Sequence, residues 1–246
     1  MQGMHIASSS SNQSEVGLKR SLSLSLTTLY GLGNILGAGI YVLVGKVISY
    51  AGLFAPLSFL IASLLACLTA FTYAELSARY PLSAGEAVYV QQGLGIRAVS
   101  ALVGLLIIFA GMVSAATILR GFTGYLQVFV PVPEIAAILV LVVVLGGLAA
   151  WGITESVTVA AIITVLEIVG LLMIIAVATP DMLTGQGLPT DYSPLLESEA
   201  WYGIFAGGFL AFYAFIGFED MVNVAEEVRE PRRNLPRALL LSLAIA

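Results

Sequence analysis

Seven runs of apolar residues constrain the fold of this chain more than any other feature of its sequence. A helix needs about 20 mostly apolar residues to cross a bilayer, and the runs cover approximately residues 22–48, 54–78, 99–127, 134–151, 156–178, 201–225 and 238 onward. In lipid, only helices and closed barrels satisfy all backbone hydrogen bonds, and these runs lack the alternating pattern of barrel strands. We therefore predict an all-α polytopic membrane protein.

The composition supports this fold class and excludes several functions. Of the 246 residues, 59% are hydrophobic and 10% are charged, and the mean hydropathy is +0.99. Soluble domains carry roughly 25% charged residues, so a soluble enzyme and a nucleic-acid-binding protein are excluded. The sequence contains no cluster of metal ligands, no nucleophile motif and no phosphate-binding loop. We expect no enzymatic activity, no metal, no cofactor and no nucleic-acid partner.

The basic residues indicate how the runs are oriented, because cytoplasmic loops of membrane proteins are enriched in lysine and arginine. Residues 1–20 form a flexible cytoplasmic tail in this interpretation, and residues 21–246 form a transmembrane domain in the cell membrane. The segment 179–200, which contains no basic residue, forms an external loop. If the runs alternate in direction, eight of the ten basic residues face the cytoplasm, namely Lys19, Arg20, Arg79, Arg97, Arg229, Arg232, Arg233 and Arg237.

Glycine interrupts two of the runs. Gly37-Ala38-Gly39-Ile40 lies near the middle of the first run, and Phe215-Ile216-Gly217-Phe218 lies in the sixth, directly before two acidic residues. Glycine lowers helix stability by about 1 kcal/mol relative to alanine. Two simpler explanations stay open at this point. Gly33 and Gly37 fit a close-packing motif for membrane helices, and the sixth helix can end near Phe218 with its acids at the membrane interface.

The places of the two interruptions in the chain suggest a transporter. Each lies in the first helix of a set of five, the first set covering about 22–178 and the second starting near 201. Matching interruptions in two halves of a chain indicate a transporter with inverted repeats. Free N–H groups at the start of a half-helix attract a carboxylate, and free carbonyl groups at the end of one attract an ammonium group. Two such breaks suit a zwitterion such as an amino acid.

Three stretches of the sequence are similar to the amino acid permeases of the amino acid–polyamine–organocation (APC) superfamily. They are Gly31–Ile40, Tyr73–Tyr89 and Phe212–Asp220, the last followed by Ala225–Arg237. The resemblance implies a LeuT-like 5+5 inverted repeat. This amino-terminal part would supply helices 1 to 6 and would be truncated within helix 7. The sequence departs from the superfamily at Ala84-Gly85-Glu86, where many members have Ser-Gly-Gly.

The resemblance also implies which residues bind the substrate. The backbone at the first break takes the carboxylate, at Gly37, Ala38, Gly39 and Ile40. Carbonyl groups at the second break accept the α-amine, at Phe215, Ile216 and Gly217, and Phe218 forms a lid or a wall. Tyr41 and Tyr213 either line the pocket or pack between helices. We favour packing for both, because aromatic residues at helical spacing more often pack than bind.

Four charged residues within or beside the runs need an explanation. Glu167 lies at the middle of the fifth run, where an ionised, lipid-facing acid costs about 2.5–3.5 kcal/mol. It is either a site for a proton or another cation, or a structural acid bonded to broken-helix backbone, and we favour the coupling role. Glu75, Arg79 and Glu86 lie near the inner ends of helices 2 and 3. They are candidates for an inner gate, although such charges are more often solvated at the interface.

These observations favour a secondary active transporter that moves amino acids or related amines across the membrane by alternating access, coupled to a proton or to sodium. Two alternatives stay open. One is a seven-helix receptor-like membrane protein, which the inside amino terminus and the broken helices disfavour. The other is a fragment with no transport activity of its own, because helices 8 and 10 of the superfamily complete the site. An intramembrane enzyme is disfavoured, because the sole histidine, His5, lies in the tail.

Overall fold

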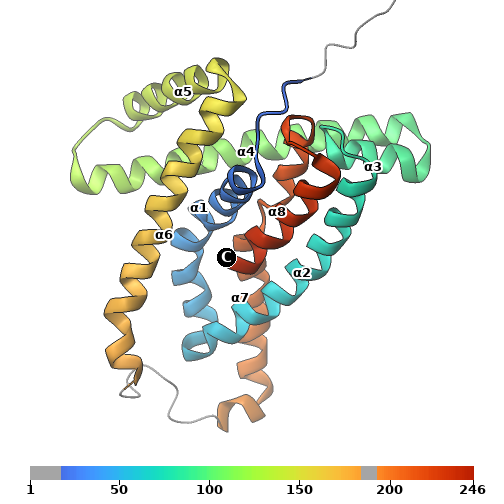
Figure 1. Cartoon of the computed structure of the whole chain (residues 1–246). Coiled ribbons are helices and arrows are strands. Elements are labelled where there is room, and N and C mark those ends of the chain that lie inside the picture. The colour runs from blue at the N-terminus through green and yellow to red at the C-terminus, as the bar shows by residue number, and fades with distance from the viewer. Residues whose placement is uncertain (1–17, 184–192) are drawn as a thin grey trace, which may run out of the picture.

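The computed structural model describes residues 18–183 and 193–246, apart from the side chains of residues 38, 181–183, 194 and 195. The described residues form helices and one isolated bridge, which agrees with the all-α prediction (Figure 1). The elements are α1 (Leu24–Ala51), η1 (Gly52–Phe54), α2 (Ala55–Arg79), α3 (Gly85–Leu94), α4 (Arg97–Phe129), α5 (Glu134–Trp151), α6 (Ile153–Leu183), η2 (Ser193–Leu196), α7 (Ser198–Phe215), η3 (Glu219–Glu227) and α8 (Pro231–Ile245).

Each predicted run contains or overlaps one long helix. Within the described residues, five stretches are long and apolar enough to cross a membrane, and one of them holds both α1 and α2. The structure differs from the prediction in two places. The short helix α3 lies between the second and third runs, where no separate helix was expected. The external connection predicted at 179–200 is shorter, because α6 continues to Leu183 and α7 begins at Ser198.

A row of small residues on α2 lets three helices approach closely. Ser58, Ala62, Ala66 and Ala70 recur every fourth residue, which places them on one helix face, and each is fully buried. At one end of this face, the Ser58 hydroxyl donates to the Ile204 carbonyl of α7 at 2.8 Å. At the other end, Ala66 and Ala70 pack in one cluster with the buried leucines of α8. Small residues at such interfaces allow close backbone contact in membrane proteins.

Enlarging a residue of this row is expected to destabilise the protein. Ala66→Leu adds three carbon atoms to a fully buried position, and overpacking of this kind typically costs about 1–3 kcal/mol. The melting temperature of the detergent-solubilised protein should therefore fall. Ala110→Leu on α4 is the matched control, because Ala110 is exposed. Equal melting temperatures for both variants would contradict the close packing of α2.

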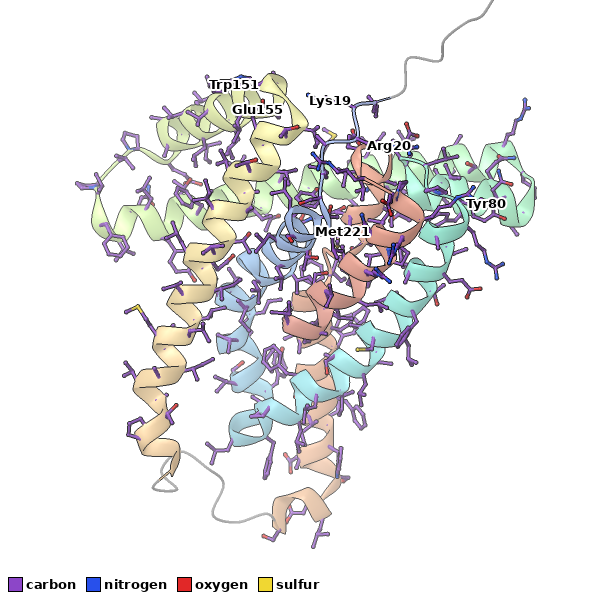
Figure 2. All side chains as sticks on the ribbon, viewed as in Figure 1. Lys19, Arg20, Tyr80, Trp151, Glu155 and Met221 are labelled. Atoms are coloured by element: carbon purple, nitrogen blue, oxygen red, sulfur yellow. The ribbon has the colours of Figure 1, made fainter. Side chains whose placement is uncertain are left out.

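The segment before α1 is tied to the segment before α8. The Leu22 N–H donates to the Glu227 carbonyl at 3.0 Å, and the Arg229 N–H donates to the Leu22 carbonyl at 2.9 Å. Leu22 and Val228 are both fully buried at this bridge. Lys19 and Arg20 lie beside it, at the same end of the helices as Tyr80, Trp151 and Glu155 (Figure 2). The end of α6 and the start of α7 lie at the opposite end (Figure 1).

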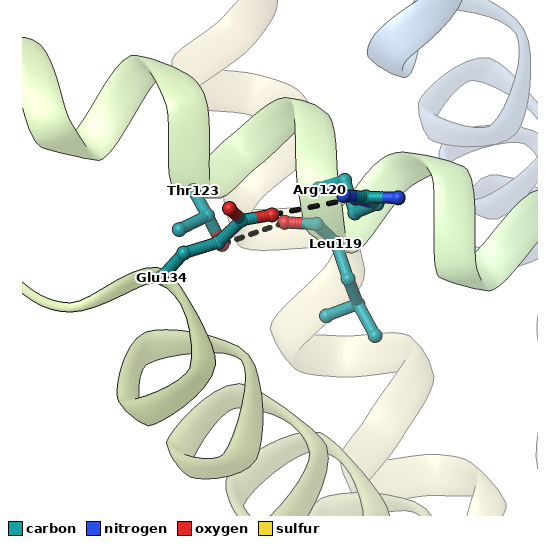
Figure 3. Close-up of polar contacts among 4 residues, drawn as sticks. All are labelled: Leu119, Arg120, Thr123 and Glu134. Atoms are coloured by element: carbon teal, nitrogen blue, oxygen red, sulfur yellow. Dashed lines mark hydrogen bonds and ion pairs between the residues drawn. The ribbon is translucent and has the colours of Figure 1, made fainter.

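Helices α4 and α5 lie at the edge of the helical bundle. Helix α4 crosses the other helices at a steep angle, and α5 returns alongside it (Figure 1). Arg120 of α4 forms an ion pair with Glu134 at the start of α5, with 3.3 Å between Nε and Oε1 (Figure 3). Both side chains are well exposed. Exposed pairs contribute at most about 1 kcal/mol, so this contact orients the turn more than it stabilises the fold.

Candidate functional site

The first predicted interruption is present in α1. Gly37 has φ −44° and ψ −132°, which is not helical, so α1 consists of two helical segments that meet at this residue. The first N–H groups of a helical segment lack partners within that segment. The residues that follow Gly37 therefore begin the second segment, and the positive end of the dipole of this half-helix lies at the break.

The second predicted interruption is present after α7. The helix ends at Phe215, and Ile216 is extended. Gly217 has φ +132°, a backbone conformation that residues other than glycine rarely adopt. Helical turns resume at Glu219 in η3. Among the described residues, no backbone N–H donates to the carbonyl of Phe215 or Ile216 across this break. Two carbonyl groups at the end of a helix are thus free to accept from an amine.

Both polar backbone groups of Gly217 already have side-chain partners. Its N–H donates to Oε2 of Glu219 at 2.7 Å, and its carbonyl accepts from Nδ2 of Asn34 at 3.4 Å. The bonds from these two side chains, Asn34 and Glu219, were not predicted from the sequence. A polar amide within the first apolar run was the signal that could have identified Asn34. Of the three carbonyls predicted to accept the substrate amine, that of Gly217 is therefore the one with a protein partner.

The two breaks face each other across closely packed backbone. A Cβ atom added at Gly39 would lie 3.0 Å from the Cα and from the carbonyl oxygen of Ala214. A Cβ atom added at Gly217 would lie 2.7 Å from the carbonyl oxygen of Asn34. Glycine at each position lets α1 and α7 touch at the level where both are interrupted. The packing that the sequence suggested for Gly33 and Gly37 is present at Gly33, where an added Cβ would meet the Thr164 hydroxyl, but it is wrong for Gly37, where an added Cβ would meet no atom within 4 Å.

The other residues predicted at the substrate site differ in how deeply they are buried. Phe218 is 2% exposed and forms a wall of the buried cluster, and Ile40 is partly buried. The side chain of Ala38 lies outside the described part of the structure. Tyr41 and Tyr213 are 41% and 59% exposed, which does not support the packing that we expected for them. An open apolar groove of about 470 Å³ lies between α2 and α7, but Gly37, Gly39 and Gly217 do not line it.

The three gate candidates do not form one network. Glu75 and Arg79 pair with each other across one turn of α2, and their side chains are 63% and 64% exposed. Glu86 takes no part in this ion pair, and its Oε1 accepts from the Tyr73 hydroxyl at 3.3 Å. Burial raises the pKa of the Glu86 carboxyl above its ordinary range, and nearby Asp220 adds to this effect, whereas the bond from Tyr73 opposes it. The structure thus separates a surface ion pair from one partly buried acid.

Glu167 lies on α6, which packs against α1. Its side chain is partly buried, and Tyr41 of α1 is near enough to interact with it electrostatically. One turn earlier, Thr164 is 2% exposed and fills the space beside Gly33 of α1. The Thr164 hydroxyl itself donates to the Ala160 carbonyl at 2.9 Å. Glu167 therefore lies close to α1, one turn of α6 beyond the Thr164–Gly33 contact.

Known proteins similar to this chain are transporters. A family model described as amino acid permease matches residues 17–246. The chain is 35% identical to cationic amino acid transporter 2, vacuolar, of Arabidopsis thaliana, in an alignment covering 93% of this chain and 39% of that protein. It is 31% identical to the branched-chain amino acid permease BcaP of Bacillus subtilis, with 94% and 53% covered, and 27% identical to the methylthioribose transporter of the same organism, with 93% and 52% covered. The chain spans about half or less of the length of these relatives.

Proposed function

The chain belongs to the amino acid permease family, and we propose from this premise that it forms the amino-terminal part of a secondary active transporter for amino acids or related amines. The family is one of membrane transporters and not of enzymes. Membership leaves no support for the seven-helix receptor alternative. The observation that carries the proposal is the pair of facing breaks, at Gly37 in α1 and at Ile216 and Gly217 after α7.

The two breaks provide complementary partners for the two ends of an amino acid. The N–H groups at Gly37, Ala38, Gly39 and Ile40 would bind the carboxylate, at the positive end of the second half of α1. The carbonyls of Phe215 and Ile216 would accept from the ammonium group, since no described backbone N–H occupies them. Phe218 would close one side of the site. The Gly217 carbonyl would contribute its remaining lone pair, because a carbonyl oxygen accepts two hydrogen bonds.

The arrangement of the helices supports a LeuT-like inverted repeat. In this proposal α1, α2, α4, α5 and α6 form the first repeat, and α7 and α8 begin the second. Helices α1 and α7 start at opposite ends of the structure (Figure 1), as the first helices of two inverted repeats must. The end that carries Lys19 and Arg20 (Figure 2) would face the cytoplasm, in keeping with the enrichment of basic residues on that side. Residues 1–17 of the proposed tail lie outside the described residues.

The proposal is tested by asking whether the protein binds both ends of an amino acid. The protein of natural length is purified and its melting temperature is measured with lysine, arginine, leucine or isoleucine. A ligand at about 100 times its Kd stabilises the native state by roughly 2.7 kcal/mol. At least one free amino acid should raise the melting temperature, and its methyl ester and N-acetyl derivatives should not. An equal effect of the blocked derivatives would refute recognition by the two breaks.

We also propose that Glu167 carries the coupling proton. Glu167→Gln keeps the shape of the side chain but cannot release a proton, so this variant should fold and take up substrate with no dependence on pH. The measurement is uptake into proteoliposomes over the pH range in which wild-type uptake changes. Glu155→Gln, at the exposed start of the same helix, is the matched control and should retain the wild-type profile. A wild-type pH profile in Glu167→Gln would assign the residue a structural role.

A further inference from the structure

Buried polar atoms without partners gather where α3 meets η3. Four side-chain atoms among the described residues are inaccessible and form no hydrogen bond, namely Ser83 Oγ, Glu86 Oε2, Tyr89 Oη and Glu227 Oε2. All four belong to α3, to the turn before it or to η3. The Ser83 N–H donates to Oε1 of Glu226 at 3.2 Å across the same contact. Burying a polar atom without a partner costs free energy. The contact between α3 and η3 therefore stabilises the structure less than its burial alone would suggest.

Glu86 is connected to the break in α7 through one tyrosine. Its Oε1 accepts from the Tyr73 hydroxyl at 3.3 Å. The Tyr73 ring packs edge-on against Phe218, with 5.8 Å between ring centroids, and against Tyr89, at 6.3 Å. Phe218 directly follows Gly217, the residue at which the break turns. Tyr73, Tyr89 and Phe218, which we call the aromatic cluster, thus lie between Glu86 and the proposed substrate site.

We propose that Glu86 is a positioning residue that holds the aromatic cluster against the break in α7, and so keeps the site closed toward the end of the protein where α3 lies. The proposal rests on the proposed transport function. Without Glu86, the Tyr73 hydroxyl would lose its acceptor inside the protein, and rotation of its ring toward water would release Phe218. The unpartnered Oε2 of Glu86 adds a cost to the closed arrangement, which lowers its advantage in free energy over an open one.

The groups around Glu86 determine how this contact responds to pH. Tyr73 faces it from α2, Tyr89 from α3, and Glu219 and Asp220 from η3. Helix α4 packs on α3 through Ser100, and its first residue, Arg97, is exposed. The ion pairs among the described residues are Glu75–Arg79 and Arg120–Glu134, so Glu86 has no cationic partner there.

The sign of the pH effect follows from the environment of the carboxyl. Burial raises the pKa of Glu86 in the closed arrangement, whereas exposure to water in the open one would return it to its ordinary value. The closed arrangement therefore binds a proton more tightly. Acidification favours closure, and the stabilisation is lost as the pH rises through the raised pKa.

The test measures how readily a cysteine at the break reacts from the side of α3. Ile216→Cys is introduced in a Cys67→Ser background, and the protein is labelled in oriented proteoliposomes with a membrane-impermeant thiol reagent. Glu86→Ala should increase the labelling rate several-fold, and Tyr73→Phe should do the same. The double variant should show no further increase, because both changes break one contact. Glu75→Ala is the matched control and should leave the rate unchanged, since Glu75 is exposed.

Glu86→Gln separates positioning from a general structural role. It keeps an acceptor for Tyr73 and resembles the protonated acid. Thiol reagents react with the thiolate, so each rate is divided by the rate of an exposed reference cysteine at the same pH. This corrected rate should be slow and independent of pH in Glu86→Gln, whereas it should fall on acidification when Glu86 is present. A corrected rate in Glu86→Ala equal to that of the protein with Glu86, or a pH-dependent corrected rate in Glu86→Gln, would overturn the proposal. If Glu86→Ala does not fold, the pH profile of Glu86→Gln decides. Labelling needs no substrate, so failure of amino acids to stabilise the wild-type protein would overturn the transport function and not this contact.

Discussion

Replacing Gly217 with alanine is expected to weaken amino acid binding by about 10- to 100-fold and to lower the melting temperature. The residue has φ +132°, and a residue other than glycine held in such a region costs about 1–3 kcal/mol. The added Cβ would also lie 2.7 Å and 2.9 Å from the carbonyl oxygen and carbon of Asn34. These atoms belong to the backbone of α1, so they cannot move aside as a flexible side chain would. Relief of this strain must shift one break relative to the other. The carbonyls of Phe215 and Ile216 would move together with the break after α7.

Gly170→Ala provides the control for this prediction. Gly170 lies within α6, and a Cβ added there meets no atom within 4 Å. Alanine is about 1 kcal/mol better than glycine in a helix interior, so this variant should bind normally and be as stable as the wild type or more so. Binding is followed by ligand-induced stabilisation, and protein stability by the melting temperature without ligand. Normal binding by Gly217→Ala would show that the break in α7 does not depend on the positive φ of this residue.

Gly39→Leu is expected to abolish substrate binding while membrane insertion continues. Insertion depends on the apolar character of the run, which leucine increases. Binding depends on close approach, and the new Cβ would lie 3.0 Å from two backbone atoms of Ala214. The rest of the leucine side chain would occupy the space beside the N–H groups proposed to hold the carboxylate. Binding of radiolabelled amino acid to purified protein is the measurement, with membrane yield as the check on insertion.

Two further substitutions make the Gly39 result specific. Gly39→Ala adds only the Cβ, whose distance requires a displacement of a few tenths of an ångström, so its binding defect should be intermediate. Gly45→Leu on the same helix should bind normally, because a Cβ at Gly45 meets no described atom within 4 Å. If Gly39→Leu takes up substrate at the wild-type rate, the carboxylate is bound elsewhere.

The sequence alone predicted the long helices, though not the short α3, and both interruptions, because each depends on local properties of the chain. A long apolar segment in lipid must satisfy its backbone hydrogen bonds internally, so every apolar run predicts a helix. Glycine within a run marks a weak point in the helix, and both marked points are broken, at Gly37 and at Gly217. The stretches around these glycines also indicated the permease family, which the match over residues 17–246 confirms. The roles of these residues in binding stay predictions.

Only the tertiary structure decided which side chains meet across the breaks. The sequence grouped Glu86 with Glu75 and Arg79, but the structure connects Glu86 to Tyr73 and leaves the other two as a surface pair. It also brings Asn34 to the carbonyl of Gly217, 183 residues further along the chain. Such contacts depend on the tilt and rotation of each helix about its axis. In helices that are apolar on every side, the sequence pattern specifies rotation weakly, and packing against neighbouring helices determines it.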